Sequence, residues 1–215
     1  MKYLAIAVAL AIAAPDAAHA EGQIWNALFV QGRTDASSGP AIWFDAHARR
    51  RDDSTLVLLR PAIGWAFSPA LLVHAGYGFI RPVPGESAEH RVWQQVIYNH
   101  AATDAVKLQG RARLEQRFGN GDDVGHRVRL LARGQVQPWA TPLQLVAWDE
   151  VFLGLNDTDW GAASGLDQNR LFLGVGADTA VRGVRVEVGY MNVYFRALER
   201  VDHVVAANVF VHLLP

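Results

Sequence analysis

The clearest alternation in the sequence is Val106-Lys107-Leu108-Gln109-Gly110-Arg111-Ala112-Arg113-Leu114-Glu115-Gln116-Arg117. Every odd-numbered side chain in it is charged or an amide, and the even-numbered ones are apolar or small until Gln116. Successive side chains of a β-strand point to opposite faces, so a strand repeats every two residues. The stretch therefore predicts a strand with one polar face and one apolar face.

The same alternation extends through the chain in both directions, and no helical period competes with it. Turn-rich pieces separate the predicted strands, which are 23–31, 40–48, 55–67, 71–81, 91–99, 106–117, 126–137, 144–156, 170–177, 184–196 and 203–214. Single-chain bacterial barrels have an even number of strands. We therefore expect a barrel of 10 to 12 strands, with one of the eleven segments, in the N-terminal third, wrongly assigned.

The pieces between the strands alternate in length and composition. Short ones are expected at 178–183, 138–143, 100–105 and 68–70, and longer ones, rich in Gly, Asp, Asn and Ser, at 157–169, 118–125 and 82–90. Short turns at one rim and longer loops at the other are typical of outer-membrane barrels, whose short turns face the periplasm.

The composition of the two strand faces distinguishes a membrane barrel from a soluble β-domain. In 71–81, large apolar side chains alternate with His74, Gly76 and Gly78, and a soluble core built on the second face would be thin. A membrane barrel places the apolar face outward and the polar face in the lumen. The sequence thus favours an all-β, antiparallel transmembrane barrel, with a soluble β-domain as the alternative. Aromatic residues near segment ends predict interfacial girdles, and they are Trp65, Phe67, Tyr98, Trp139, Tyr190, Tyr194 and Phe195.

The N-terminal residues have the layout of a secretory signal peptide. A positive start at Lys2 precedes an apolar run from Leu4 to Ala14, and Ala18-His19-Ala20 offers small residues for cleavage. The run is too short for a bilayer-spanning helix, which needs roughly 20 apolar residues. We expect 1–20 to be removed and 21–215 to form the barrel in the outer membrane of a Gram-negative bacterium, after export through the periplasm. Outer-membrane lipids and the outer-membrane assembly machinery are the expected partners.

Several motifs resemble a known family. They are Leu59-Arg60-Pro61, Glu89-His90-Arg91-Val92-Trp93-Gln94-Gln95, Arg111-Ala112-Arg113-Leu114-Glu115-Gln116-Arg117-Phe118, Asp149-Glu150-Val151-Phe152-Leu153, Leu155-Asn156-Asp157, Asp167-Gln168-Asn169-Arg170, Gly189-Tyr190-Met191-Asn192 and His203-Val204. In this order they resemble the domain of unknown function 2490 family, uncharacterised Gram-negative proteins assigned to the outer-membrane β-barrels. The resemblance implies a membrane barrel and no established activity. The chain departs from many such barrels at its end, where Leu213-Leu214-Pro215 replaces a terminal aromatic residue.

The alternation gathers charged side chains in the predicted lumen. The basic members are Arg60, Arg91, Lys107, Arg111, Arg113, Arg117, Arg127, Arg129, Arg133, Arg170 and Arg185, and the acidic members are Asp45, Glu115, Glu150 and Glu187. Two interpretations remain open: a salt-bridged plug in a structural barrel, or a narrow arginine-lined conduit for small anionic solutes. In either case we expect Glu115 and Glu150 to pair with the arginines of 106–117 and 126–137, because unpaired buried charge is costly.

A lipid-modifying enzyme, catalysing acyl transfer or deacylation, is the alternative from another class. Its candidate residues are His47, Asp52 and Ser54, together with Glu86, Ser87, Glu89 and His90 of a predicted outer loop, but no Gly-x-Ser-x-Gly nucleophile elbow is present. Solvated loop positions are the favoured interpretation, and no catalytic residue is assigned. The run Gly119-Asn120-Gly121-Asp122-Asp123 predicts a hairpin loop.

Composition limits the remaining functions. The chain has 20 basic and 21 acidic residues and no cysteine. This near balance of charge argues against a nucleic-acid binder, and a disulfide framework or thiolate metal site is impossible. The histidines show no paired metal-ligand spacing, so no metal and no cofactor is expected.

Overall fold

The computed structural model describes residues 21–50, 53–85, 87–138 and 141–213. The predicted signal peptide, 1–20, lies outside the described residues, as do Leu214 and Pro215. Eleven strands follow one another: β1 (Glu21–Arg33), β2 (Gly39–Arg50), β3 (Thr55–Ala66), β4 (Leu71–Val83), β5 (Glu89–Ala101), β6 (Val106–Phe118), β7 (Val124–Val136), β8 (Leu143–Gly154), β9 (Gly165–Asp178), β10 (Val184–Phe195) and β11 (Arg200–Leu213). A single turn of 3₁₀ helix, η1 (Arg196–Leu198), precedes β11.

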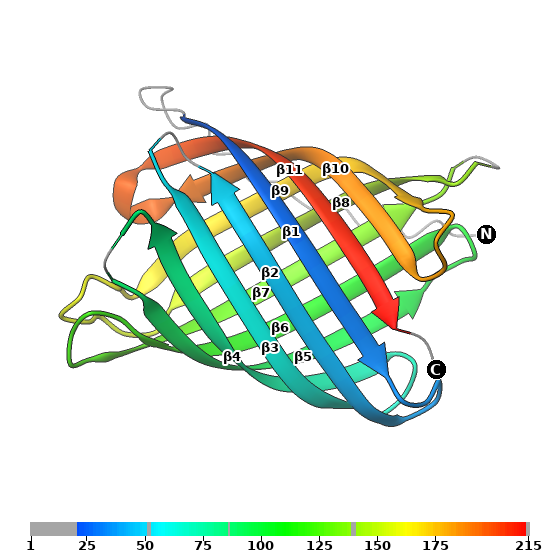
Figure 1. The fold of residues 1–215 in the computed structure, drawn as a ribbon, viewed down its shortest axis with the longest axis horizontal. Coiled ribbons are helices and arrows are strands. Elements are labelled where there is room, and N and C mark those ends of the chain that lie inside the picture. Colours follow the sequence, from blue (N-terminus) through cyan, green and yellow to red (C-terminus); the bar gives the residue numbers. More distant parts are fainter. Residues whose placement is uncertain (1–20, 51–52, 86, 139–140, 214–215) are drawn as a thin grey trace, which may run out of the picture.

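The strands form one closed barrel, as the alternation predicted. Consecutive strands pair antiparallel, and β1 closes the ring by pairing parallel with β11, from Glu21 opposite Asp202 to Gly32 opposite Leu213. Figure 1 shows this seam, where the blue β1 lies beside the red β11. The expectation of an even number of strands, with one of the eleven segments wrongly assigned, is wrong. An odd number of strands can close the barrel because β1 and β11 run in the same direction. The start of β1 and the end of β11 therefore lie at opposite rims.

The two rims differ less than the sequence predicted. One, here called the turn end, carries the connections 34–38, 67–70, 102–105 and 179–183. The other, the loop end, carries 119–123, 155–164 and η1, and of these only 155–164 is clearly longer than the turns. The prediction of long loops at 82–90 and 118–125 is wrong because β4, β5, β6 and β7 continue into those segments.

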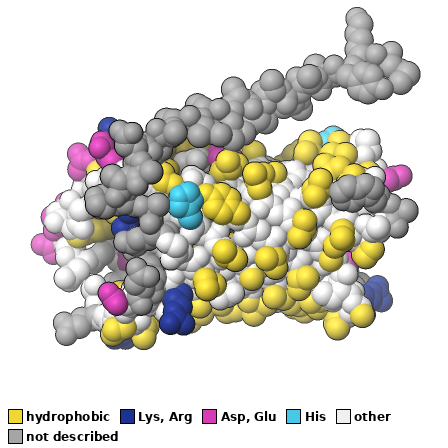
Figure 2. All heavy atoms as spheres, turned by 90° about the horizontal axis from the view of Figure 1, so that it is seen from above, with side chains coloured by type: hydrophobic (Ala, Val, Ile, Leu, Met, Phe, Trp, Pro, Cys, Tyr) yellow, Lys and Arg dark blue, Asp and Glu magenta, His cyan; other side chains and the backbone are white. Residues whose placement is uncertain are grey.

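Apolar side chains cover the outer surface between the rims. Ile63 is 75% exposed, Val205 57% and Leu173 55%, and all three lie on outward-facing positions of their strands. Figure 2 shows hydrophobic side chains along the middle of the barrel and charged ones near its two ends. Among the described residues, no helix is long and apolar enough to cross a membrane. The strands thus have the predicted apolar exterior.

The predicted aromatic girdles are present in part. Trp65, Phe67, Tyr98 and Tyr190 are exposed on the outside of the barrel. The assignment of Phe195 to a girdle is wrong, because Phe195 packs against an interior cluster that includes Phe172 and Met191. Tyr194 is partly buried, and Trp139 lies outside the described residues.

Two paired glycines give an aromatic ring its place against the inner wall. Gly174 of β9 and Gly189 of β10 lie opposite each other. A Cβ on Gly174 would come within 2.6 Å of Cζ of Phe172, and one on Gly189 within 2.7 Å of the same atom. Phe172 is fully buried, and its ring stacks on Trp148 with ring centroids 5.3 Å apart. The absence of side chains at both glycines therefore lets the Phe172 ring lie directly against the wall of the barrel.

We expect Gly174→Ala to lower the free energy of unfolding by about 1 to 3 kcal/mol, the usual cost of overpacking. The new methyl group would also meet the carbonyl oxygen of Val188 at 2.5 Å, and this backbone atom cannot move aside easily. Gly110→Ala is the matched control, because no atom lies within 4 Å of a Cβ there. Urea titration of both variants measures the difference, and equal midpoints would contradict the tight fit.

Candidate functional site: a charged lumen with two cavities

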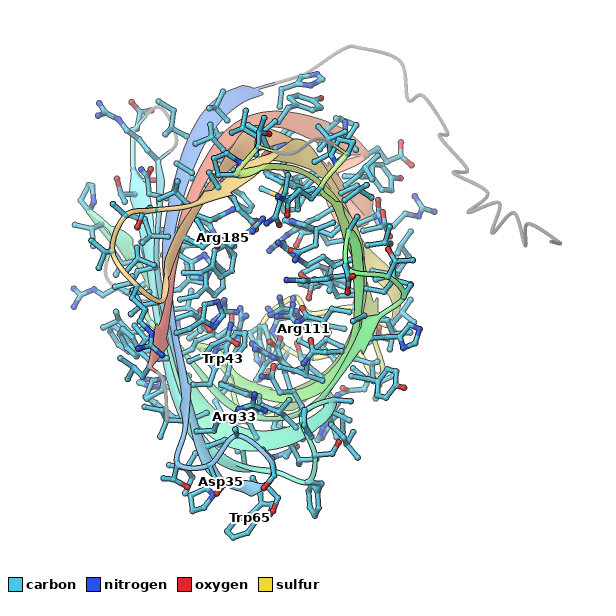
Figure 3. All side chains as sticks on the ribbon, turned by 90° about the vertical axis from the view of Figure 1, so that its right-hand side faces the viewer. Arg33, Asp35, Trp43, Trp65, Arg111 and Arg185 are labelled. Atoms are coloured by element: carbon cyan, nitrogen blue, oxygen red, sulfur yellow. The ribbon has the colours of Figure 1, made fainter. Side chains whose placement is uncertain are left out.

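The structure places the residues of the predicted lumen network on the inner face of the barrel. Those that are buried are Asp45, Arg60, Arg91, Arg113, Glu115, Arg127, Arg129, Glu150, Arg170, Arg185 and Glu187. Arg111, Arg117 and Arg133 are partly buried, and Lys107 is exposed at the wall of a cavity near the turn end. Figure 3 looks along the barrel and shows Arg111, Arg185 and Trp43 around a centre into which no drawn side chain projects.

Glu115 is the centre of the first ion-pair cluster. It lies directly opposite Arg127 on the neighbouring strand, and its carboxylate accepts hydrogen bonds from Arg127 Nη2 at 2.6 Å and Arg129 Nη1 at 2.8 Å. Nη1 of Arg91 is 3.6 Å from Oε2, and Nη1 of Arg113 is 3.9 Å from Oε1. Glu115 is completely buried, so this one carboxylate lies within 4 Å of four guanidiniums and offsets only part of their positive charge.

Arg129 links this cluster to Glu150. Its Nε and Nη2 donate to the two oxygens of Glu150 at 2.9 and 3.0 Å, in the bidentate geometry that suits a guanidinium. Arg111 donates to the same carboxylate at 2.6 Å. Arg129 therefore bridges two acids on different strands, and the network spans β6, β7 and β8.

Further ion pairs line the rest of the wall. Asp45 accepts from Arg60 Nε at 2.6 Å and contacts His47 Nε2 at 2.8 Å. Glu187 pairs with both Arg185 and Arg133. Asp45 and Glu187, like Glu115 and Glu150, therefore each contact more than one basic side chain.

Several lumen residues were not predicted from the sequence, among them Glu89, Asp202, His47 and Arg49. Glu89, expected in a solvated loop, accepts from both Arg91 and Arg117 at 2.7 and 2.6 Å. Asp202 is fully buried and accepts from Gln23 at 2.5 Å. His47 and Arg49 follow Asp45 at intervals of two residues, and this parity is the signal that would have found them.

Among the described residues of the enzymatic alternative, His47 and His90 lie on opposite faces of the barrel wall. His47 lies inside the lumen on Asp45 and Arg60, away from the outer boundary. His90 is outside, where its Nδ1 contacts the Tyr77 hydroxyl. Asp52 and Glu86 lie outside the described residues. Within the described ranges, no group of three or more His, Asp or Glu side chains is arranged to hold a metal ion.

The lumen contains two cavities that meet at a ring of arginines. A cavity of about 690 Å³ lies toward the turn end, and one of about 200 Å³ lies toward the loop end. Five residues line both cavities and are here called the arginine belt: Trp25, Arg49, Arg60, Arg129 and Arg170. The belt is the boundary between the cavities, so anything that moves along the lumen must pass it.

Cations outnumber anions in this interior. Among the described residues, eight arginines are buried, namely Arg49, Arg60, Arg91, Arg113, Arg127, Arg129, Arg170 and Arg185. Five carboxylates are buried with them, namely Asp45, Glu115, Glu150, Glu187 and Asp202. The excess positive charge favours anions in the lumen.

At the loop end, the predicted hairpin loop 119–123 is attached to the long connection 155–164. Asp159 accepts hydrogen bonds from the backbone N–H groups of Asp122 at 2.8 Å and Asp123 at 3.2 Å, and Trp160 Nε1 donates to the Asp123 carbonyl at 2.7 Å. The Arg117 guanidinium lies 5.1 Å from the centroid of the Trp160 ring. This contact joins the longest loop to the neighbouring hairpin loop at the loop end.

The loop contact is expected to be lost in acid. The backbone N–H of Asp122, assisted by that of Asp123, holds the pKa of the Asp159 carboxyl below its usual value of 3.8. A carboxyl with a lowered pKa stabilises the loop fully above the usual pKa and ceases to do so as the pH falls through the lower value. The amide shifts of Asp122 and Asp123, followed by NMR, should therefore change with a midpoint below pH 3.8. Asp159→Asn should abolish this titration, and a midpoint unaffected by the substitution would contradict the assignment.

The fold and the lumen define a class: a closed all-β barrel with an apolar exterior and an arginine-rich interior. The chain belongs to the family described as "Protein of unknown function (DUF2490)", whose model matches residues 22–203, and this confirms the resemblance seen in the sequence. It is similar to "Uncharacterized protein MexAM1_META1p0181" of Methylorubrum extorquens strain AM1, with 34% identity over 169 residues that cover 72% of each chain. No solved structure matches the chain.

Proposed function

We propose that this protein is an outer-membrane β-barrel whose lumen is a narrow, anion-attracting conduit. The membrane assignment is supported by the outward-facing Ile, Leu and Val side chains between two rims of charged residues. It is also supported by barrel closure, because every strand edge in the described chain is paired and no backbone polar group of the sheet needs water. In this proposal, residues 1–20 direct export, outer-membrane lipids surround the barrel and the outer-membrane assembly machinery inserts it.

The arginine belt is the observation that carries the conduit proposal. Arg49 and Arg170 form no ion pair with a carboxylate among the described residues, although each is at least nine-tenths buried. In a salt-bridged plug each buried cation would be expected to have an acidic partner, since an unpaired buried charge is destabilising. An anion passing the belt would supply that partner transiently. Cations would be repelled at the same point.

Two measurements test the proposal. Cell fractionation should recover the mature protein in the outer membrane, and the refolded protein in a planar bilayer should carry a current whose reversal potential in a chloride gradient shows anion preference. Recovery as a soluble periplasmic protein would contradict the membrane assignment. Correct insertion without current would contradict the conduit and leave a plugged structural barrel.

A further inference from the structure

The larger cavity has one apolar wall. Phe29 of β1 stacks on Phe210 of β11 with ring centroids 4.7 Å apart, and Trp43 of β2 packs edge-on against Phe29 at 6.1 Å. Ala27, Trp148, Met191 and Ala206 continue this wall. A conduit for small inorganic ions has no need of such a surface, because hydrated ions gain nothing from aromatic rings. The wall instead resembles the apolar lining of pockets for organic ligands.

The end of this cavity nearest the belt is basic, and part of its hydrogen-bonding capacity is unused. Nε of Arg49, Nε of Arg170 and Nη1 of Arg60 are buried and have no hydrogen-bond partner among the described residues. The guanidinium carbons of Arg49 and Arg170 lie 4.2 and 5.1 Å from the centroid of the Trp25 ring. Two guanidiniums thus lie against one aromatic ring at the end of an apolar wall, and Arg60 lines the same part of the cavity.

We infer that the larger cavity binds an organic anion that combines an aromatic or aliphatic body with a single carboxylate or sulfonate group. The body lies on the Phe29, Phe210 and Trp43 wall, and the anionic group accepts hydrogen bonds from Arg49, Arg60 and Arg170. A volume of about 690 Å³ suits a small organic ligand. The inference deepens the proposed function, on which it rests, because it names the class of anion that the lumen holds before the belt.

The experiment is calorimetric titration of the barrel, refolded in lipid nanodiscs, with 1-naphthalenesulfonate. Two comparison ligands separate the contributions: methanesulfonate has the charge without the rings, and 1-naphthalenemethanol has the rings without the charge. Empty nanodiscs give the background from lipid. We expect naphthalenesulfonate to bind at least tenfold more tightly than either comparison ligand.

Two variants and one control variant locate the ligand. Arg49→Gln should weaken naphthalenesulfonate about tenfold, the equivalent of one charged hydrogen bond, and should leave the urea midpoint unchanged or higher because it removes an unpaired buried cation. Arg182→Gln makes the same charge change on the exposed 179–183 turn and should bind like the unaltered protein. Phe210→Ala should weaken naphthalenesulfonate and leave methanesulfonate unaffected.

The outcomes separate this inference from the conduit. Equal affinity for naphthalenesulfonate and methanesulfonate, or no effect of Arg49→Gln, would overturn the ligand site even if the barrel carries an anion current. Binding that depends on Arg49 in a barrel without current would support the site and contradict the conduit.

Discussion

Glu115→Gln is expected to lower the free energy of unfolding by about 3 to 5 kcal/mol, the usual cost of removing one member of a buried ion pair. Gln keeps the size of the side chain but removes its charge. Arg127 and Arg129, which donate to this carboxylate at 2.6 and 2.8 Å, would lose their charged acceptor. Arg113 would lose its carboxylate neighbour at 3.9 Å, and Arg91 would lose the one at 3.6 Å while keeping its ion pair with Glu89.

Urea unfolding of the barrel refolded in lipid vesicles, followed by tryptophan fluorescence, measures this change. Glu199→Gln is the control, because it removes the same charge from an exposed ion pair with Arg196 at 3.1 Å. Exposed pairs contribute at most about 1 kcal/mol. If the two variants unfold at the same urea concentration, the Glu115 cluster is hydrated and does not stabilise the lumen.

Glu150→Gln should increase anion selectivity, and Arg49→Gln should reduce it. Both residues line the larger cavity, and the two substitutions change its charge by one unit in opposite directions. A unit charge about 4 Å from a passing ion contributes about 1 kcal/mol in water, which corresponds to roughly a fivefold change in the permeability ratio. Glu150→Gln should also lower the stability of the barrel, because Arg111 and Arg129 both donate to this carboxylate.

Reversal potentials in a potassium chloride gradient give the permeability ratio for each variant. Arg182→Gln, on an exposed turn, controls for a change of charge outside the lumen. Shifts of both lumen variants in the same direction, or no shift in either, would contradict an ion path along this wall. If Glu150→Gln also leaves the stability unchanged, the braced-lumen interpretation is wrong.

Local alternation was sufficient to predict the strands and their inner faces. In β6 and β7, polar and apolar residues separate so cleanly that the positions of Arg113, Glu115, Arg127 and Arg129 followed from parity alone. The partners across strands could also be anticipated, because adjacent strands are about 5 Å apart and each arginine needs a nearby acid.

Long-range closure could not be predicted in this way. The number of strands depends on whether β1 meets β11 parallel or antiparallel, and no local pattern encodes a pairing between residues as distant as Glu21 and Asp202. At strand ends the composition was misleading. Arg49 is buried but is followed in the sequence by two more arginines, so no alternation marks its face. Phe195 has the type of a girdle residue but the inward parity of Met191.

In the proposed membrane barrel, the apolar face contacts lipid and the charged face contacts water. The chain contains no cysteine, so single cysteines can be introduced along β7 and labelled with a nitroxide. In lipid vesicles, labels at Val128, Leu130 and Ala132 should be accessible to oxygen, which concentrates in the bilayer, and a label at Leu131 should be more accessible to a water-soluble nickel complex. This period-two pattern is the predicted result. Greater accessibility of Leu130 and Ala132 to the nickel complex than to oxygen would contradict the account and indicate a barrel surrounded by water.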